Sequence, residues 1–181
     1  MPDLDLHAAL AREELVAPTV RVALVSLDPA LAAAIRVASI DATLSDTAEF
    51  CAAYGIPAED AANCIVVVGK RGEAVSYAAC VVLATTRLDV NGVVRRLLDA
   101  RSASFAPMDD ATRLTEMEYG GISPIGLPAG WRLLVDSAVV ERERVIVGAG
   151  LRAAKISLPG STLRELPGAE VIDGLARPRA D

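Results

Sequence analysis

The chain has 181 residues, 52% of them hydrophobic and only 3% aromatic, which predicts one domain over residues 1–181 with an aliphatic core. Its net charge of −6 excludes a broad basic surface for long nucleic acids, although single arginines can still contact a short nucleic-acid end. Residues 1–15 lack the basic and apolar regions of a signal peptide, and no apolar run is long enough to span a membrane, so we expect a cytoplasmic protein.

The first half of the chain predicts helices that alternate with strands. Residues 6–15 have the spacing of an amphipathic helix, within a helical N-terminal extension over residues 1–30. Residues 19–27 fit a strand or a buried helix equally well, so the pattern leaves both open. The other predicted elements of this half are strands at 35–40, 64–68 and 75–84, a helix from Ser45 or Asp46 to Tyr54 that ends at Gly55, and a helical turn at 57–62.

The second half predicts strands that cluster late in the chain. A long loop is expected at residues 116–130, because glycines and prolines interrupt any regular element there. The remaining predicted elements are a helix from Asp89 to Leu98, a strand at 102–105, a helix from Pro107, strands at 132–135, 144–147 and 153–158, a helical turn at 159–166 and a frayed tail from Arg177. This order predicts a mixed α/β (α+β) fold, in which one curved mixed sheet or partial barrel is surrounded by helices.

The scarcity of certain residue types narrows the possible chemistry. The single histidine, His7, lies far from the glycine-rich loop in sequence, so we expect a partly exposed terminal residue rather than a catalytic base. Cys51, Cys64 and Cys80 have neither the spacing of a zinc site nor that of a redox motif, and we expect buried free thiols. We therefore predict a protein without bound metal, disulfide or cofactor.

The strongest local motif is the glycine-rich stretch at residues 119–126. Gly120 and Gly121 allow backbone turns in which N–H groups converge, and such groups can bind a carbonyl oxygen and stabilise an oxyanion. Ser123 adds a hydroxyl, and Pro124 stiffens the backbone. The alternative is a tight connection between two structural elements, and the loop alone does not exclude it.

Two further polar positions have both a functional and a structural interpretation. Asp136 follows an apolar strand, where its carboxylate can line a pocket or cap the turn at Ser137. Arg87 lies just before a predicted helix and can contact a phosphate or remain solvated. For both residues the sequence alone favours the structural interpretation.

Several motifs occur in an order that resembles one known family. They are Asp46-Thr47-Ala48, Ala53-Tyr54-Gly55-Ile56-Pro57, Asn63-Cys64-Ile65-Val66-Val67, Gly120-Gly121-Ile122-Ser123-Pro124, Val135-Asp136 and the stretch from Val145 to Gly150. Over residues 35–175 the chain is similar to the YbaK/EbsC family, the free-standing relatives of the editing domain inserted in bacterial prolyl-tRNA synthetases. The resemblance also implies that family's curved mixed sheet with surrounding helices.

The resemblance implies hydrolysis of the ester that links a wrong amino acid to the 3′ adenosine of a tRNA. Backbone groups of the loop would hold the aminoacyl carbonyl, and a water assisted by the substrate's own ribose hydroxyl would attack it. The implied partner is the acceptor end of a charged tRNA, with no membrane, metal or cofactor involved. The implied catalytic residues are Gly120, Gly121, Ser123, Asn63 and Asp136, and the implied substrate-binding residues are Tyr119, Ile122, Pro124, Thr47 and Arg87.

Two departures from the family's pattern affect the expected chemistry. The family's pocket lysine falls on Asn63, which can donate a hydrogen bond but carries no charge, and Lys70 lies at an odd offset that faces the other side of a strand. Before the loop, Glu116 and Tyr119 stand where the family usually has glycine and proline. Glu116 or Glu118 can therefore add a carboxylate at the pocket mouth, and Tyr119 can stack on a base or wall off the amino-acid side chain. Two hypotheses therefore remain: a deacylase with an altered pocket, or a non-catalytic module that binds an aminoacyl ester, a nucleotide or a protein partner. The amino acid and the formation of a homo-oligomer also stay open.

Overall fold

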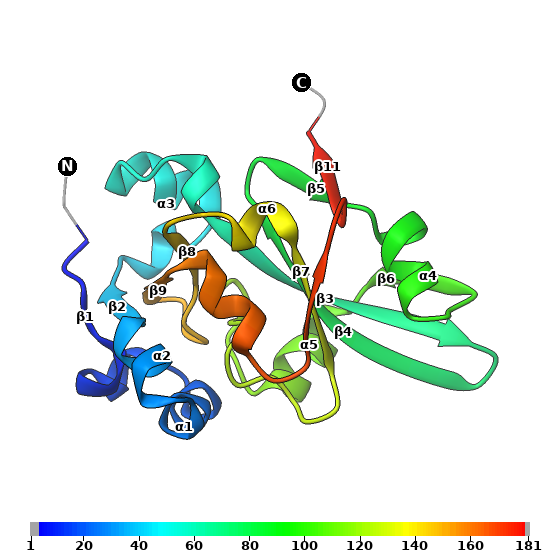
Figure 1. Ribbon diagram of the computed structural model, residues 1–181, viewed down its shortest axis with the longest axis horizontal. Coiled ribbons are helices and arrows are strands. Elements are labelled where there is room, and N and C mark those ends of the chain that lie inside the picture. Colours follow the sequence, from blue (N-terminus) through cyan, green and yellow to red (C-terminus); the bar gives the residue numbers. More distant parts are fainter. Residues whose placement is uncertain (1–3, 180–181) are drawn as a thin grey trace.

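Within residues 4–179, which the computed structural model describes, the strands form two main sheets and a small one (Figure 1). The four-stranded sheet is antiparallel, in the order β1 (His7–Ala8), β2 (Arg36–Ser39), β9 (Ala154–Leu158) and β8 (Val145–Gly148). The five-stranded sheet is mixed, in the order β10 (Ala169–Ile172), β7 (Arg132–Asp136), β4 (Ala74–Leu83), β3 (Ala62–Arg71) and β6 (Ser102–Phe105). In the small sheet, β5 (Thr86–Leu88) pairs with β11 (Ala176–Pro178).

Short helices surround these sheets (Figure 1). The α-helices are α1 (Pro18–Ser26), α2 (Pro29–Ala34), α3 (Thr47–Tyr54), α4 (Arg95–Leu97), α5 (Met108–Thr115) and α6 (Ser137–Val140). A π-helical turn at Val90–Val94 leads into α4, and 3₁₀ turns lie at Ala9–Ala11, Glu13–Leu15, Ala42–Leu44, Ala58–Asp60 and Gly160–Glu165. In the part of the chain that the structure describes, none of these helices combines the length and the apolar character that a membrane crossing requires.

The two main sheets share a hydrophobic core. On β4, Ala79 and Val81 belong to the cluster that contains Val37 of β2 and Ile156 of β9, whereas Cys80 between them belongs to a second cluster. This alternation follows from the two-residue period of a strand. An isolated parallel bridge between β8 and the residue before β3 links the sheets. The mixed α/β fold predicted from the sequence is confirmed, with the expected sheet divided in two.

The predicted helix at residues 6–15 is wrong. The segment forms the short strand β1, which pairs with β2, and then two 3₁₀ turns. The Ala9 N–H donates to the Ile35 carbonyl at 3.1 Å, so pairing with a distant strand overrides the helical spacing of a short segment. The ambiguous residues 19–27 lie largely in α1, which begins at a proline, a favoured first residue of a helix.

Helix α1 is part of the core and positions two later loops. Its Val20 is fully buried in the shared cluster. A Cβ on Gly126 would come within 2.5 Å of the Thr19 carbonyl oxygen, and a Cβ on Gly150 would come within 2.4 Å of the Ala17 Cβ. Only glycine permits such close approach, so the helix fixes both loops that frame the candidate site.

The predicted frayed tail from Arg177 is wrong as far as the structure describes it, and residues 180 and 181 lie outside the described part. Strand β11 pairs with β5, and the Arg177 guanidinium lies 2.8 Å from an Asp89 carboxylate oxygen. Strand β10, which the sequence did not predict, pairs in parallel with β7. The C-terminal segment therefore belongs to the folded domain.

Candidate functional site

The glycine-rich loop between α5 and β7 packs its backbone against the turn that follows β8. The Gly150 N–H donates to the Gly121 carbonyl at 2.7 Å, and the Glu118 N–H donates to the Gly150 carbonyl at 2.8 Å. A Cβ on Gly121 would lie 2.6 Å from the Leu151 backbone, and a Cβ on Gly148 would lie 2.3 Å from carbonyl oxygens of the loop. Both positions therefore require glycine for close packing.

Gly120 is glycine for a different reason. Its φ of +82° lies in the left-handed region, which side chains with a Cβ rarely adopt. Its N–H donates to no acceptor among residues 4–179. This conformation leaves one backbone donor of the loop available to a ligand.

The same loop forms one wall of a cavity of about 370 Å³. The other walls come from the start of α3, the first half of β3, the end of β6, helix α5 and strands β8 and β9. Gly120 and Ile122 line it from the loop. The lining side chains with a polar group or an aromatic ring are Asp46, Thr47, Asn63, Cys64, Phe105, Tyr119 and Lys155.

Asn63, near the start of β3, lines the cavity and is held by α3. The Thr47 hydroxyl, in the first turn of that helix, donates to Asn63 Oδ1 at 2.6 Å. An amide with its oxygen occupied in this way still has two N–H donors on its nitrogen. Helix α3 thus orients Asn63 so that its donors remain available.

Lys155 of β9 lines the same cavity, and the sequence analysis did not assign it to a site. It is 8% exposed, its Nζ donates to the Ser45 carbonyl at 2.9 Å, and it lies 5.3 Å from the centroid of the Phe50 ring. Burial is the main cause that lowers the pKa of the Lys155 ammonium, while Cys51 and Asp46 act in the opposite direction. The only sequence signal was a lone charged residue within a short strand.

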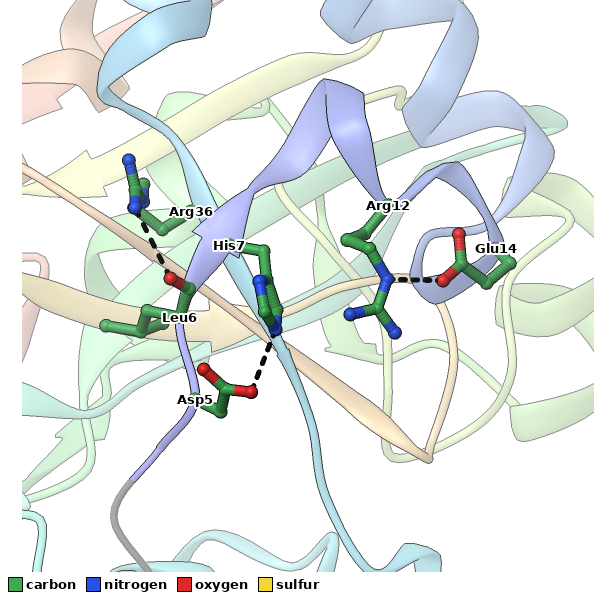
Figure 2. Close-up of polar contacts among 6 residues, drawn as sticks. All are labelled: Asp5, Leu6, His7, Arg12, Glu14 and Arg36. Carbon is green, nitrogen blue, oxygen red and sulfur yellow. Dashed lines mark hydrogen bonds and ion pairs between the residues drawn. The ribbon is translucent and has the colours of Figure 1, made fainter.

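The other nucleophilic or basic candidates do not supply a reactive group to the cavity. Burial raises the pKa of the Cys64 thiol and raises the pKa of Cys80 to about 12, so both thiols stay protonated at neutral pH. Cys51, Cys64 and Cys80 are all free. Figure 2 shows His7 in the N-terminal segment, with its Nε2 3.0 Å from an Asp5 carboxylate oxygen. No cluster of three potential metal ligands occurs within the described residues.

Three loop residues that the resemblance implied do not line the cavity: Gly121, Ser123 and Pro124. The Gly121 N–H donates to the Glu118 carbonyl at 2.9 Å, so it is not free to bind a substrate. Ser123 is fully buried, and its Oγ accepts the Ile125 N–H at 3.2 Å. Pro124 lines a different hollow, at the far end of the loop. The expected placement of all three residues at the cavity is corrected, because Gly121 packs against the turn after β8 and the chain turns inward after Ile122.

Asp136 and Arg87 also lie away from the cavity. Asp136 is 6% exposed, and its two oxygens accept the N–H groups of Ala138 at 3.0 Å and Ala176 at 2.9 Å. The carboxylate therefore caps α6 and holds the C-terminal segment, which corrects its expected placement in the pocket. Arg87 is exposed on β5 and lines a neighbouring hollow, which also includes Phe105.

A larger hollow of about 480 Å³ lies at the other end of the loop and has mostly apolar walls. Its charged groups are paired, since Arg132 Nε and Nη2 donate to the two Glu170 oxygens at 2.6 and 2.7 Å. The hydrogen bonds from Arg132 lower the pKa of the Glu170 carboxyl. Because the smaller cavity contains the unpaired polar groups, we place the candidate site there.

Comparisons with known proteins agree with the fold described above. Residues 41–166 match the aminoacyl-tRNA editing domain. The crystal structure of hypothetical protein APE2540 is 25% identical, with a TM-score of 0.70 over 80% of this chain and 93% of that one. A candidate trans-editing enzyme for prolyl-tRNA synthetase is 23% identical, with a TM-score of 0.71 over 87% and 97%. A candidate signal transduction protein from Marinobacter aquaeolei VT8 is 20% identical, with a TM-score of 0.54 over 86% of this chain but 30% of its own length.

Proposed function

Because the chain belongs to the aminoacyl-tRNA editing domain family, we propose that it is a trans-acting deacylase that hydrolyses the ester of mischarged tRNA. In this reaction a water oxygen forms a bond to the aminoacyl carbonyl carbon, and the carbonyl electron pair moves to its oxygen. The intermediate collapses when the bond to the ribose oxygen breaks, and a proton from the water ends on that ribose oxygen. The products are a free amino acid and an uncharged tRNA.

The observation that carries this proposal is the meeting of Asn63 and Gly120 at one cavity. Both offer N–H donors, from the side-chain amide and from the backbone. Donors fixed at the oxygen where negative charge develops stabilise the transition state, at about 3 kcal/mol for one donor. Neither donor needs to change its protonation state, so this chemistry requires no histidine or thiolate. The cavity volume of about 370 Å³ falls in the range of small-ligand sites.

Two exposed aromatic side chains support an unpaired nucleic-acid end as the substrate. Phe105 and Tyr119 line the cavity yet are 60% and 56% exposed, which places them at its mouth. Unpaired bases stack on such rings with about 1–3 kcal/mol per base. Arg87 lies in the hollow on the other side of Phe105, where a backbone phosphate of the same strand would follow.

A binding module without catalysis is the second candidate function. Asn63 supplies no charge at the position where the YbaK/EbsC family has its pocket lysine. A fold of this kind also accounts for 30% of a longer candidate signal transduction protein. In this alternative the cavity binds an aminoacyl ester or a nucleotide and releases it unchanged.

Single-turnover deacylation of a panel of mischarged tRNAs tests the proposed function. The panel begins with mischarged proline tRNA, because one structural relative is a candidate trans-editing enzyme for prolyl-tRNA synthetase. We expect hydrolysis of at least one substrate and a roughly hundredfold slower rate for Asn63→Ala, as the loss of one oxyanion donor implies. Binding of a non-hydrolysable amide analogue without hydrolysis of any panel member would favour the binding module.

A further inference from the structure

Lys155 is a buried cation that forms no ion pair with a carboxylate among the described residues, although the Asp46 carboxylate lines the same cavity and favours its charged form. Its ammonium has three N–H donors, and the Ser45 carbonyl accepts one of them. Burying an ammonium without a direct ion pair costs free energy, and an apolar side chain would pack there without that cost. The position of this charge therefore points to a ligand rather than to packing.

Strand β9 and helix α3 fix where the charge lies. Ala154 and Ile156, the neighbours of Lys155 in β9, belong to the shared core, so Lys155 projects from the opposite face of the strand. There its ammonium lies beside the Phe50 ring of α3 and bonds the carbonyl of Ser45, just before that helix. The ammonium is held from two sides at the wall of the cavity.

The group that anchors Lys155 also lies against the glycine-rich loop. A Cβ on Gly120 would be 3.5 Å from Ser45 Oγ. Ser45 is 2% exposed, and its Oγ is the one buried side-chain nitrogen or oxygen atom among the described residues that has no hydrogen-bond partner. Ser45 thus lies next to both the Lys155 ammonium and Gly120, and Lys155 and Gly120 line the same cavity.

We propose that Lys155 is a catalytic residue whose ammonium contacts the carbonyl oxygen of the aminoacyl ester and stabilises the oxyanion during water attack. This inference rests on the proposed function and adds the positive charge that Asn63 does not supply, from β9 instead of β3. A tRNA phosphate suits this ammonium less well, because Lys155 is buried whereas Phe105 and Tyr119 mark the exposed mouth. A cation at a developing oxyanion acts mainly in the transition state, so it affects kcat more than KM.

The first test removes the charge and compares the two lysines of the chain. Lys155→Met should lower the single-turnover rate by about 10²-fold with little change in the half-saturating concentration. Lys70→Met is the matched control, because Lys70 is exposed on β3 outside the cavity, and it should keep the parent's rate. Circular dichroism and thermal unfolding establish that each variant is folded, and Lys155→Gln replaces Lys155→Met if the latter does not fold.

The second test moves the charge to the other strand. The double variant Asn63→Lys/Lys155→Met should recover at least about tenfold of the lost rate, because a cation then enters the same cavity from β3. A purely structural role of Lys155 would not be repaired by a charge on a different strand. An unchanged rate in folded Lys155→Met would overturn the proposal for Lys155 and leave the proposed function standing.

Binding of a tetrahedral phosphonate analogue of aminoacyl-adenosine separates the two proposals. The parent should bind this analogue at least about tenfold more tightly than Lys155→Met, whether or not the parent is an enzyme. If no mischarged tRNA is hydrolysed but this difference is found, the deacylase proposal fails and Lys155 remains the residue that contacts the anion. Equal binding of the analogue by the two proteins, or no binding to the parent, overturns the role of Lys155.

Discussion

The two halves of the loop between α5 and β7 border different hollows and differ in how the nearby charges are used. Tyr119, Gly120 and Ile122 border the cavity of about 370 Å³, where the Lys155 ammonium forms no ion pair with a carboxylate among the described residues. Residues 124–130 border the hollow of about 480 Å³, where Arg132 and Glu170 neutralise each other. Of these two hollows the second is larger, but an unpaired polar group is the better sign of a binding site because its burial has a cost that a ligand can offset.

The largest expected effect compares a glycine from each half of the loop. Gly121→Ala places a Cβ 2.6 Å from the Leu151 backbone and should lower the free energy of unfolding by about 3 kcal/mol. Gly130→Ala meets no atom within 4 Å at a φ of +81° and should cost only about 1 kcal/mol of backbone strain. Urea unfolding measures both values, and equal losses would show that the first half is not the more tightly packed one.

The next effect concerns substrate binding at the two hollows. Phe105→Ala should weaken binding of a non-hydrolysable aminoacyl-tRNA analogue by about 2 kcal/mol, roughly thirtyfold, if one base stacks on the ring. Trp131→Leu alters an aromatic residue of the larger hollow and should leave binding unchanged. Titration by fluorescence anisotropy measures both affinities. A larger loss of affinity for the Trp131 variant would assign the binding surface to the other hollow.

A smaller effect tests whether α3 orients Asn63. Thr47→Val keeps the shape of the side chain but removes the donor to Asn63 Oδ1, and the deacylation rate should fall about fivefold, or roughly 1 kcal/mol. Thr47→Ser keeps the hydroxyl and should stay within about twofold of the parent. Equal rates for both variants would contradict the orienting role.

The smallest effect belongs to the paired charges of the larger hollow. Arg132 lowers the pKa of Glu170 below its ordinary value of 4.5, so the pair stabilises the fold above that value and the contribution is lost as the pH falls through the lowered pKa. The side chains are 33% and 42% exposed, which limits the contribution to about 0.5 kcal/mol. Glu170→Gln should therefore be less stable than the parent at about pH 7, and the difference should shrink as the pH falls through the lowered pKa of Glu170. A difference that does not change with pH would contradict this account.

Local patterns predicted most of the framework. The β-branched run in β3 and the turn after it predicted the hairpin with β4, and Gly55 ends α3 at a φ of +66° as its position implied. Strands β5, β10 and β11 have only three or four residues, and each exists through pairing with a strand far away in the sequence. Such short segments carry no periodic signal of their own, so local patterns could not predict them.

The candidate site could be predicted only in part. Resemblance to a family pointed to Asn63 and Gly120, which the structure brings to one cavity, and their catalytic roles stay predictions until activity is measured. The same motifs included Ser123 and Asp136, whose oxygens bond backbone N–H groups outside the cavity. For Asp136 the sequence alone had favoured such a cap, and only the family motif suggested a place in the pocket. Lys155 could not be predicted, because its place in the site depends on how α3 covers β9 in the folded protein.

The two hydrogen bonds of Asp136 indicate how far a truncated fragment of this domain must extend at its C-terminus to remain folded. The match to the editing domain stops at residue 166, yet one oxygen of this carboxylate is bonded to Ala176. A fragment cut at residue 166 would lose β10 from the edge of the five-stranded sheet and leave a buried carboxylate oxygen unpaired. The newly exposed edge of β7 would be prone to pair with other copies. The C-terminal boundary of such a fragment should therefore lie beyond β11, past residue 166 where the match to the editing domain ends.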